Sequence, residues 1–117
     1  MKFLHFLFIL SFLVSCKNKP DTLFEKLDAD DTKIHFVNTI EESEKDNVLN
    51  YEYFYNGGGV AVADFNNDGW MDVYFTANQG ADKLYLNKEN LQFEDVTEQA
   101  GIQWKGEWKT GVTVVDL

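Results

Sequence analysis

Short apolar runs, separated by glycine, asparagine and aspartate, make up most of the chain after residue 20. Such runs predict β-strands, because strands are short, favour β-branched and aromatic residues, and are joined by turns rich in glycine and asparagine. The four clearest candidates are Val60–Ala63, Met71–Thr76, Lys83–Asn87 and Gln92–Val96. No long helical period interrupts them. We therefore predict an all-β fold.

Weaker patterns flank these four runs. Thr32–Asn38 and the alternating tyrosines of Tyr51–Tyr55 are further strand candidates. Leu23–Leu27 has the length of a single helical turn. The segment Thr97–Gly101 predicts one more helical turn, with its threonine as N-cap and its glycine as the C-terminal stop.

One segment of the chain recurs. Gly59–Phe65 matches Gly111–Leu117, with glycine, two valines and an aspartate in the same positions. The two copies are roughly fifty residues apart, and the four predicted strands lie between them. Four antiparallel strands per period of this length are typical of a β-propeller blade. We predict about one complete blade with parts of its neighbours, and we expect the chain to be the N-terminal part of a longer protein.

The loop between the first two predicted strands carries the candidate chemistry. Oxygen-bearing side chains stand at its first, third, fifth and ninth positions, and Gly69 stands sixth. The candidate ligands are the carboxylates of Asp64, Asp68 and Asp72, the amide oxygen of Asn66 and the main-chain carbonyl of Trp70. A hard cation that takes about 6–8 oxygens suits this set, and Ca²⁺ is the first choice.

Two other interpretations of this loop compete with the cation site. An EF-hand would need a bidentate acid at the twelfth position, where this chain has Phe75, and its loop would join helices rather than strands. A turn rich in aspartate and asparagine, closed by Gly69, would need no metal at all. We favour the cation site because four regularly spaced oxygen donors exceed what a turn requires.

The N-terminus has a different character. Phe3–Val14 is almost wholly apolar, too short to cross a hydrocarbon core of about 30 Å, and of a length that suits a secretory signal. It leads into Leu13-Val14-Ser15-Cys16, which resembles a bacterial lipobox, whose cysteine is acylated and becomes the first mature residue. An ordinary signal peptide or a short anchor helix is the alternative. We predict a lipoprotein signal peptide at 1–15, the lipidated Cys16 and a tether at 16–32, and propeller repeats at 33–117.

Charge and composition exclude several classes of function. The 117 residues carry 20 acidic side chains against 10 lysines, and the net charge is −10. This sign argues against nucleic acid as a partner, because phosphate contacts need clustered basic residues. Two histidines and one cysteine leave too little material for a Cys/His zinc site or a disulfide framework.

These motifs carry a family resemblance over about residues 33–117. Gly59–Asp72 resembles the FG-GAP/VCBS repeat of integrin-α-type β-propellers, and the wider stretch is similar to a bacterial branch related to cartilage acidic protein, which often carries an ASPIC/UnbV domain. The turn Lys88–Leu91 departs from the glycine-rich turn common in the family. The resemblance implies that Ca²⁺ is bound by Asp64, Asn66, Asp68, the Trp70 carbonyl and Asp72, and that Asp116 begins a second such loop.

The resemblance implies a calcium-binding β-propeller module for protein or glycan recognition. With the lipid anchor it would sit in the bacterial cell envelope, and we expect the outer membrane. One alternative is part of a polysaccharide-acting propeller enzyme whose catalytic residues lie outside this chain, and another is a purely structural role with calcium as a folding staple. Trp70, Trp104 and Trp108 could stack on sugars, although packing between blades is the commoner use.

The lipobox gives a direct test. Replacing Cys16 by serine removes the thiol that would be acylated, so Cys16→Ser expressed in a bacterium should lose palmitate labelling and leave the membrane fraction. Radiolabelled palmitate and cell fractionation measure both effects. Labelling that persists in Cys16→Ser would show that the lipobox interpretation is wrong.

Overall fold

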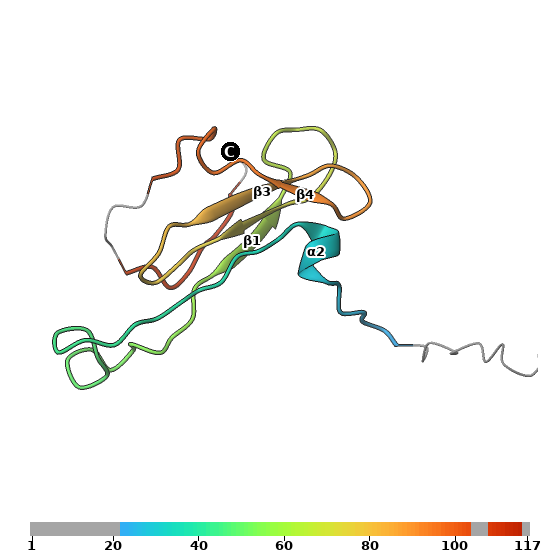
Figure 1. The fold of residues 1–117 in the computed structure, drawn as a ribbon. Helices are drawn as coiled ribbons and strands as arrows, with labels where there is room; N and C mark the ends of the chain where they lie inside the picture. The colour runs from blue at the N-terminus through green and yellow to red at the C-terminus, as the bar shows by residue number, and fades with distance from the viewer. Residues whose placement is uncertain (1–21, 104–107, 116–117) are drawn as a thin grey trace, which may run out of the picture.

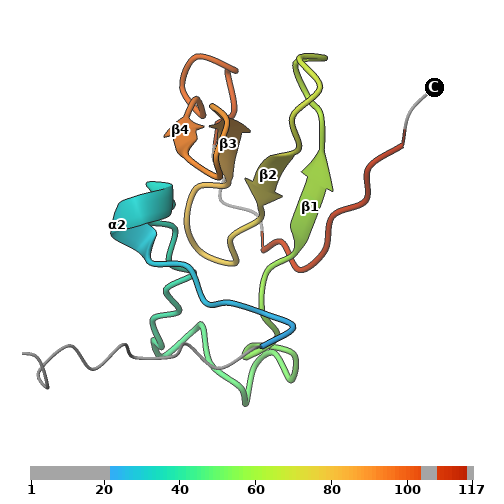
Figure 2. The same cartoon turned by 90° about the vertical axis from the view of Figure 1, so that its right-hand side faces the viewer.

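The computed structural model describes residues 22–103 and 108–115. Its regular elements are one short helix, α2 (Ala29–Thr32), and four strands, β1 (Val60–Ala63), β2 (Asp72–Phe75), β3 (Lys83–Asn87) and β4 (Phe93–Asp95). The strands form one antiparallel sheet in the order β1-β2-β3-β4, so that each strand pairs with the next one along the chain (Figures 1 and 2). The structure confirms the predicted all-β class and the four strands, and this meander is the fold expected of a propeller blade.

Strand register divides the side chains between two faces of the sheet, because directly paired residues point to the same side. Val60 pairs with Phe75, and Val73 pairs with Tyr85, which defines a first face. Ala61 pairs with Tyr74, which pairs with Leu84 in turn, and these residues define the second face. Each face is covered by a different segment of chain from outside the sheet.

The first face is covered by the segment that follows α2. The ring of Phe36 stacks on Phe75 with centroids 4.7 Å apart, and Phe75 meets Tyr85 edge-on at 5.9 Å. The prediction of a strand at Thr32–Asn38 was wrong: Thr32 ends α2, and the residues after it form no strand. Phe36 packs on the sheet face while Val37 is exposed, so the alternation of this segment does not reflect pairing at a sheet edge.

The second face is approached by residues 108–115, the segment nearest the C-terminus that the structure describes (Figure 2). The ammonium group of Lys109 lies 3.1 Å from the buried carboxylate of Asp82, which also accepts hydrogen bonds from the Ala77 amide and the Tyr74 hydroxyl. Residues 111–115 form no strand, although the repeat predicted one there. The Asp82 carboxylate thus joins β2, the β2–β3 connection and the C-terminal segment.

Opposing effects act on the ionisation of this carboxylate. Burial raises the pKa of Asp82, but hydrogen bonds from Ala77 and Tyr74 and the charge of Lys109 outweigh it and leave the pKa below its ordinary value. Burial, and then the hydrogen bond to Asp82, raises the pKa of Tyr74 to about 12. Asp82 is therefore ionised at neutral pH, and the Tyr74 hydroxyl donates a hydrogen bond to it.

Local hydrogen bonds explain two further corrections. Tyr51–Tyr55 is a series of turns and no strand, because the Phe54 amide donates to the Tyr51 carbonyl and the Asn56 amide donates to the Tyr53 carbonyl. Leu23–Leu27 forms no helix, and the helical turn begins instead at Ala29, where the Asp28 carboxylate accepts the Asp30 amide as an N-cap.

The two turns after β3 follow the sequence more closely. Gly101 has a φ of +70° and ends a hydrogen-bonded turn, as predicted. The predicted N-cap differs, because the amide at the start of this turn, that of Thr97, donates to Asp95. In the β3–β4 turn, Glu89, Asn90 and Leu91 have φ values of 71°, 51° and 58°. Non-glycine residues enter this region at a cost in energy, so this turn is less favourable than a glycine-rich turn would be.

Antiparallel order places the loops at two opposite ends of the sheet. The β1–β2 loop and the β3–β4 turn share one end, and the β2–β3 connection lies at the other.

Within the described residues, no helix is long and apolar enough to cross a membrane.

The glycines before β1 allow a close approach to β2 and provide a matched test. A Cβ on Gly58 would lie 2.0 Å from the Thr76 carbonyl oxygen, whereas a Cβ on Gly57 would meet nothing within 4 Å. We expect Gly58→Ala to lower the free energy of unfolding by about 1–3 kcal/mol and Gly57→Ala to change it by less than about 1 kcal/mol. Urea denaturation followed by circular dichroism measures both. Equal values for the two variants would mean that the β1–β2 approach is looser than described.

Candidate cation-binding loop

The last acidic residue of the β1–β2 loop is the most deeply placed. Asp72 is fully buried, and its carboxylate accepts the Phe65 amide at 2.8 Å and the Asn87 amide, also at 2.8 Å. Both oxygens are therefore bonded to main-chain N–H groups, one from the start of the loop and one from the end of β3. Such bonds offset the cost of burying a carboxylate.

The other side-chain ligand candidates form a network among themselves. The Asp64 carboxylate accepts the amides of Asp68 at 3.1 Å and Gly69 at 2.8 Å. The Asn66 side-chain oxygen accepts the same Asp68 amide at 3.0 Å, while its nitrogen donates to the Asp68 carboxylate at 2.8 Å. Oxygens of Asp64 and Asn66 therefore converge on a single N–H group. The loop gathers oxygens from its first and third positions around one point.

The backbone of the loop turns as the sequence indicates. Gly69 has a φ of +90°, the left-handed region that glycine enters without strain. Asn67 has a φ of 59°, which asparagine tolerates better than most residues. Trp70 follows with its side chain 45% exposed, so its indole stands at the surface next to the loop.

Asp68 is fully ionised well below neutral pH. The Trp70 amide, followed by the Asn66 side chain, holds the pKa of the Asp68 carboxyl below its ordinary value, and the nearby positive charge of Lys88 adds to the effect. Lys88 belongs to the β3–β4 turn and pairs with Glu94 at 3.1 Å. The two connections at this end of the sheet therefore interact electrostatically.

The arrangement described corresponds to a hydrogen-bonded loop. No three acidic, histidine or cysteine side chains among the described residues lie close enough together to hold a metal ion. Asp64 and Asn66 converge, but Asp68 and Asp72 direct their carboxylates to other N–H groups. The predicted ligands are thus neighbours in one loop, and binding of Ca²⁺ by them stays a prediction.

Asn87 belongs to this site although sequence reasoning missed it. Its amide donates to Asp72, and its side-chain nitrogen donates to the Met71 carbonyl at 3.1 Å. The residue ends β3, and the antiparallel order of the strands brings the end of β3 beside the start of β2. The sequence offered one indication of this role, because Asn87 is a polar residue at the end of the apolar strand β3.

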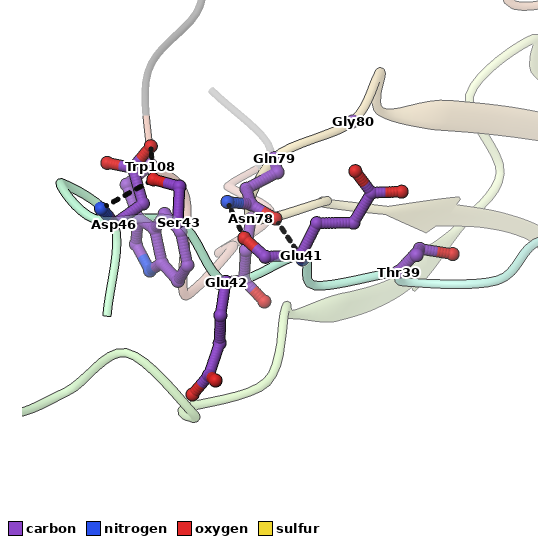
Figure 3. A pocket seen from close by; sticks show the side chains of 9 residues that line it. All are labelled: Thr39, Glu41, Glu42, Ser43, Asp46, Asn78, Gln79, Gly80 and Trp108. Carbon is purple, nitrogen blue, oxygen red and sulfur yellow. Dashed lines mark hydrogen bonds between the residues drawn. The ribbon is translucent and has the colours of Figure 1, made fainter. Parts of the chain in front are cut away.

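A separate cavity of about 780 Å³ lies between residues 39–46, the β2–β3 connection and Trp108 (Figure 3). Hydrogen bonds between amide groups line one side of the cavity. Gln79 forms two hydrogen bonds with the Glu41 main chain, and Asn78 forms two with the Asn38 side chain. The carboxylates of Glu41 and Glu42 extend in opposite directions in this view (Figure 3).

Trp108 is the aromatic wall of this cavity. Its ring lies 5.0 Å from that of Phe54 and meets Tyr51 edge-on at 5.7 Å. The buried indole N–H has no hydrogen-bond partner among the described residues. Packing within the chain therefore accounts for much of the Trp108 surface, and the part of the ring that lines the cavity offers a ligand an aromatic surface.

Three predicted site residues lie outside the described residues. They are Cys16 of the lipobox, Trp104 and Asp116, the expected first ligand of a second loop.

The family model for FG-GAP-like repeats matches residues 64–117. The match begins at the first residue of the loop and continues through β2, β3 and β4 to the second copy of the repeated segment. No curated protein and no solved structure matches the chain. The match supports the FG-GAP-like repeat family, and with the four-stranded sheet it indicates a β-propeller-type module.

Proposed function

We propose that residues 33–117 are part of a calcium-stabilised β-propeller module that recognises a protein or a glycan outside the cytoplasm. Acylation of Cys16 would hold the module in the bacterial cell envelope, in the outer membrane. The observation that supports calcium most directly is the convergence of the Asp64 and Asn66 oxygens on one N–H group within a loop of the FG-GAP-like repeat.

The donors of the loop suit Ca²⁺ chemically. Asp64, Asp68 and Asp72 supply carboxylates, Asn66 supplies an amide oxygen and Trp70 a carbonyl, and a hard cation prefers oxygen ligands of these kinds. Each carboxylate oxygen that accepts one N–H has a second lone pair. When bound, Ca²⁺ would neutralise carboxylates that otherwise repel one another, and so stabilise the folded loop.

Terbium luminescence provides the sharpest test, because Tb³⁺ occupies calcium sites and is sensitised by a nearby indole, here Trp70. We expect full-length protein to show sensitised emission that excess Ca²⁺ removes, with a dissociation constant for Ca²⁺ of about 10⁻⁴–10⁻³ M. At about 100-fold excess over that constant, Ca²⁺ should raise the free energy of unfolding by about 2.7 kcal/mol. Asp68→Ala removes the central carboxylate and should abolish the emission sensitised by Trp70 and the share of the stabilisation by Ca²⁺ that this loop provides.

Two variants control this experiment. Asp31→Ala removes the same charge from an exposed position in α2 and should leave the emission unchanged. Trp70→Phe keeps the main-chain carbonyl, so it should reduce the emission while calorimetry still detects Ca²⁺. If Asp68→Ala binds as tightly as Asp31→Ala, the loop is only a turn and the calcium proposal fails.

The cavity beside Trp108 supports the recognition part of the proposal. An aromatic wall with neighbouring carboxylate and amide groups suits a polyhydroxylated ligand. A glycosidase would need two carboxylates facing each other across a bond, and Glu41 and Glu42 point in opposite directions (Figure 3). These two residues therefore form no catalytic pair, and the cavity within this chain favours a binding module.

Neutral oligosaccharides can decide between the two ligand classes. Saturation-transfer NMR with cellohexaose, xylohexaose and maltohexaose should detect contact with the full-length protein if the ligand is a glycan. Trp108→Phe keeps a ring against Phe54 and Tyr51 but presents a smaller aromatic surface to a sugar, and it should weaken such binding several-fold. If none of these sugars shows transfer, the glycan ligand is rejected and a protein ligand remains.

A further inference from the structure

Asn87 carries a buried oxygen with no donor. The residue is 6% exposed, and its side-chain Oδ1 has no hydrogen-bond partner among the described residues. An unsatisfied buried acceptor costs about 1–3 kcal/mol, so a fold that keeps one needs a reason for it. The other polar groups of Asn87 are both used, since the main-chain amide donates to Asp72 and Nδ2 donates to the Met71 carbonyl.

These two hydrogen bonds place Oδ1 beside the end of the loop. Oδ1 and Nδ2 are bonded to the same carbon, and Nδ2 lies 3.1 Å from the carbonyl of Met71, the residue between Trp70 and Asp72. The main-chain amide of Asn87 lies 2.8 Å from the Asp72 carboxylate. The residue that carries the unpaired oxygen therefore contacts Met71 and the proposed ligand Asp72, although it lies fifteen residues beyond Asp72 in sequence.

The loop alone leaves the coordination of Ca²⁺ incomplete. With one oxygen from each of four side chains and one carbonyl it supplies five, whereas Ca²⁺ takes about 6–8 oxygens, and water commonly supplies the rest. A water molecule bound to a cation turns its lone pair toward the ion and its O–H groups outward. Those O–H groups need acceptors, and Oδ1 of Asn87 is an acceptor that lacks a donor.

We propose that Asn87 is a positioning residue of the calcium site, whose Oδ1 accepts a hydrogen bond from a water molecule bound to the cation. This inference rests on the proposed calcium site and extends it beyond the nine-residue motif. Asn87 would then act twice on the site, because its main-chain amide orients Asp72 and its side-chain oxygen anchors the water. Polar groups that orient metal ligands in this way commonly change metal affinity by about 10–100-fold when removed.

Two substitutions separate the oxygen from the nitrogen of this side chain. Asn87→Leu removes both, whereas Asn87→Asp keeps an oxygen in place, replaces the donor to Met71 by a second oxygen and adds a negative charge. We expect Asn87→Leu to weaken Ca²⁺ binding about 10-fold and Asn87→Asp to bind at least as tightly as the parent. Asn90→Asp adds the same charge at an exposed position in the adjacent turn and controls for the charge of the new carboxylate. Calorimetric titration of the full-length protein with Ca²⁺ gives the affinities, and urea denaturation in chelator gives the stability without Ca²⁺.

Three results would overturn the inference. In the first, Asn87→Leu lowers stability in chelator but leaves the Ca²⁺ affinity unchanged, which would make the residue purely structural. In the second, Asn87→Asp binds Ca²⁺ more weakly than Asn90→Asp, a comparison that holds even if Asn87→Leu does not fold. In the third, luminescence lifetimes of Tb³⁺ in H₂O and D₂O show one more bound water in Asn87→Leu, which would mean that Oδ1 coordinates the ion directly.

The same measurements distinguish this inference from the proposed function. If the parent protein binds neither Tb³⁺ nor Ca²⁺, the calcium site fails and the role of Asn87 fails with it. If the parent binds Ca²⁺, Asp68→Ala does not, and Asn87→Leu binds as the parent does, only the role of Asn87 is rejected.

Discussion

The carboxylate of Asp72 holds the β1–β2 loop against the rest of the sheet. It is fully buried, and a buried carboxylate is tolerated only when hydrogen bonds replace its lost hydration. Here the replacements are two main-chain N–H groups, one from Phe65 at the start of the loop and one from Asn87 at the end of β3. The path of the loop, its proximity to the β3–β4 turn and the position of Asn87 all follow from satisfying this one group.

The loop also shows how closely spaced acids are accommodated in one short segment. Asp64, Asp68 and Asp72 lie within nine residues, and each accepts at least two N–H hydrogen bonds within or next to the loop. These N–H dipoles offset the mutual repulsion of the carboxylates. A cation would share these oxygens with the N–H groups through their second lone pairs, so the stabilisation that it adds would be measured against a loop that is already hydrogen-bonded.

Local patterns in the sequence predicted the sheet well, because each strand of a meander pairs with its neighbour in the chain. Val60–Ala63 and Lys83–Asn87 have the predicted bounds, and the turn at Gly69 lies where its glycine indicated. The errors concern residues whose partners are distant. Phe36 packs on Phe75 on one face of the sheet, and Tyr51 packs on Trp108. The spacing of apolar residues around Phe36 and Tyr51 therefore led to the wrong prediction of strands. Asn87 was missed for the same reason, since its role depends on a contact with Asp72 that no local pattern contains.

The meander has a further consequence for how its two ends communicate. The β1–β2 loop lies at one end of β2, and the cavity beside Asn78 and Trp108 lies at the other. Four residues of strand at about 3.3 Å each separate the two ends by about 13 Å, whereas charges in physiological salt are screened over about 8 Å. A change of charge at an exposed position of the loop therefore has little effect on the electrostatic potential at the cavity. Mutations can accordingly accumulate at one end of the sheet with little electrostatic penalty at the other, and ligand preference and ion affinity can evolve independently.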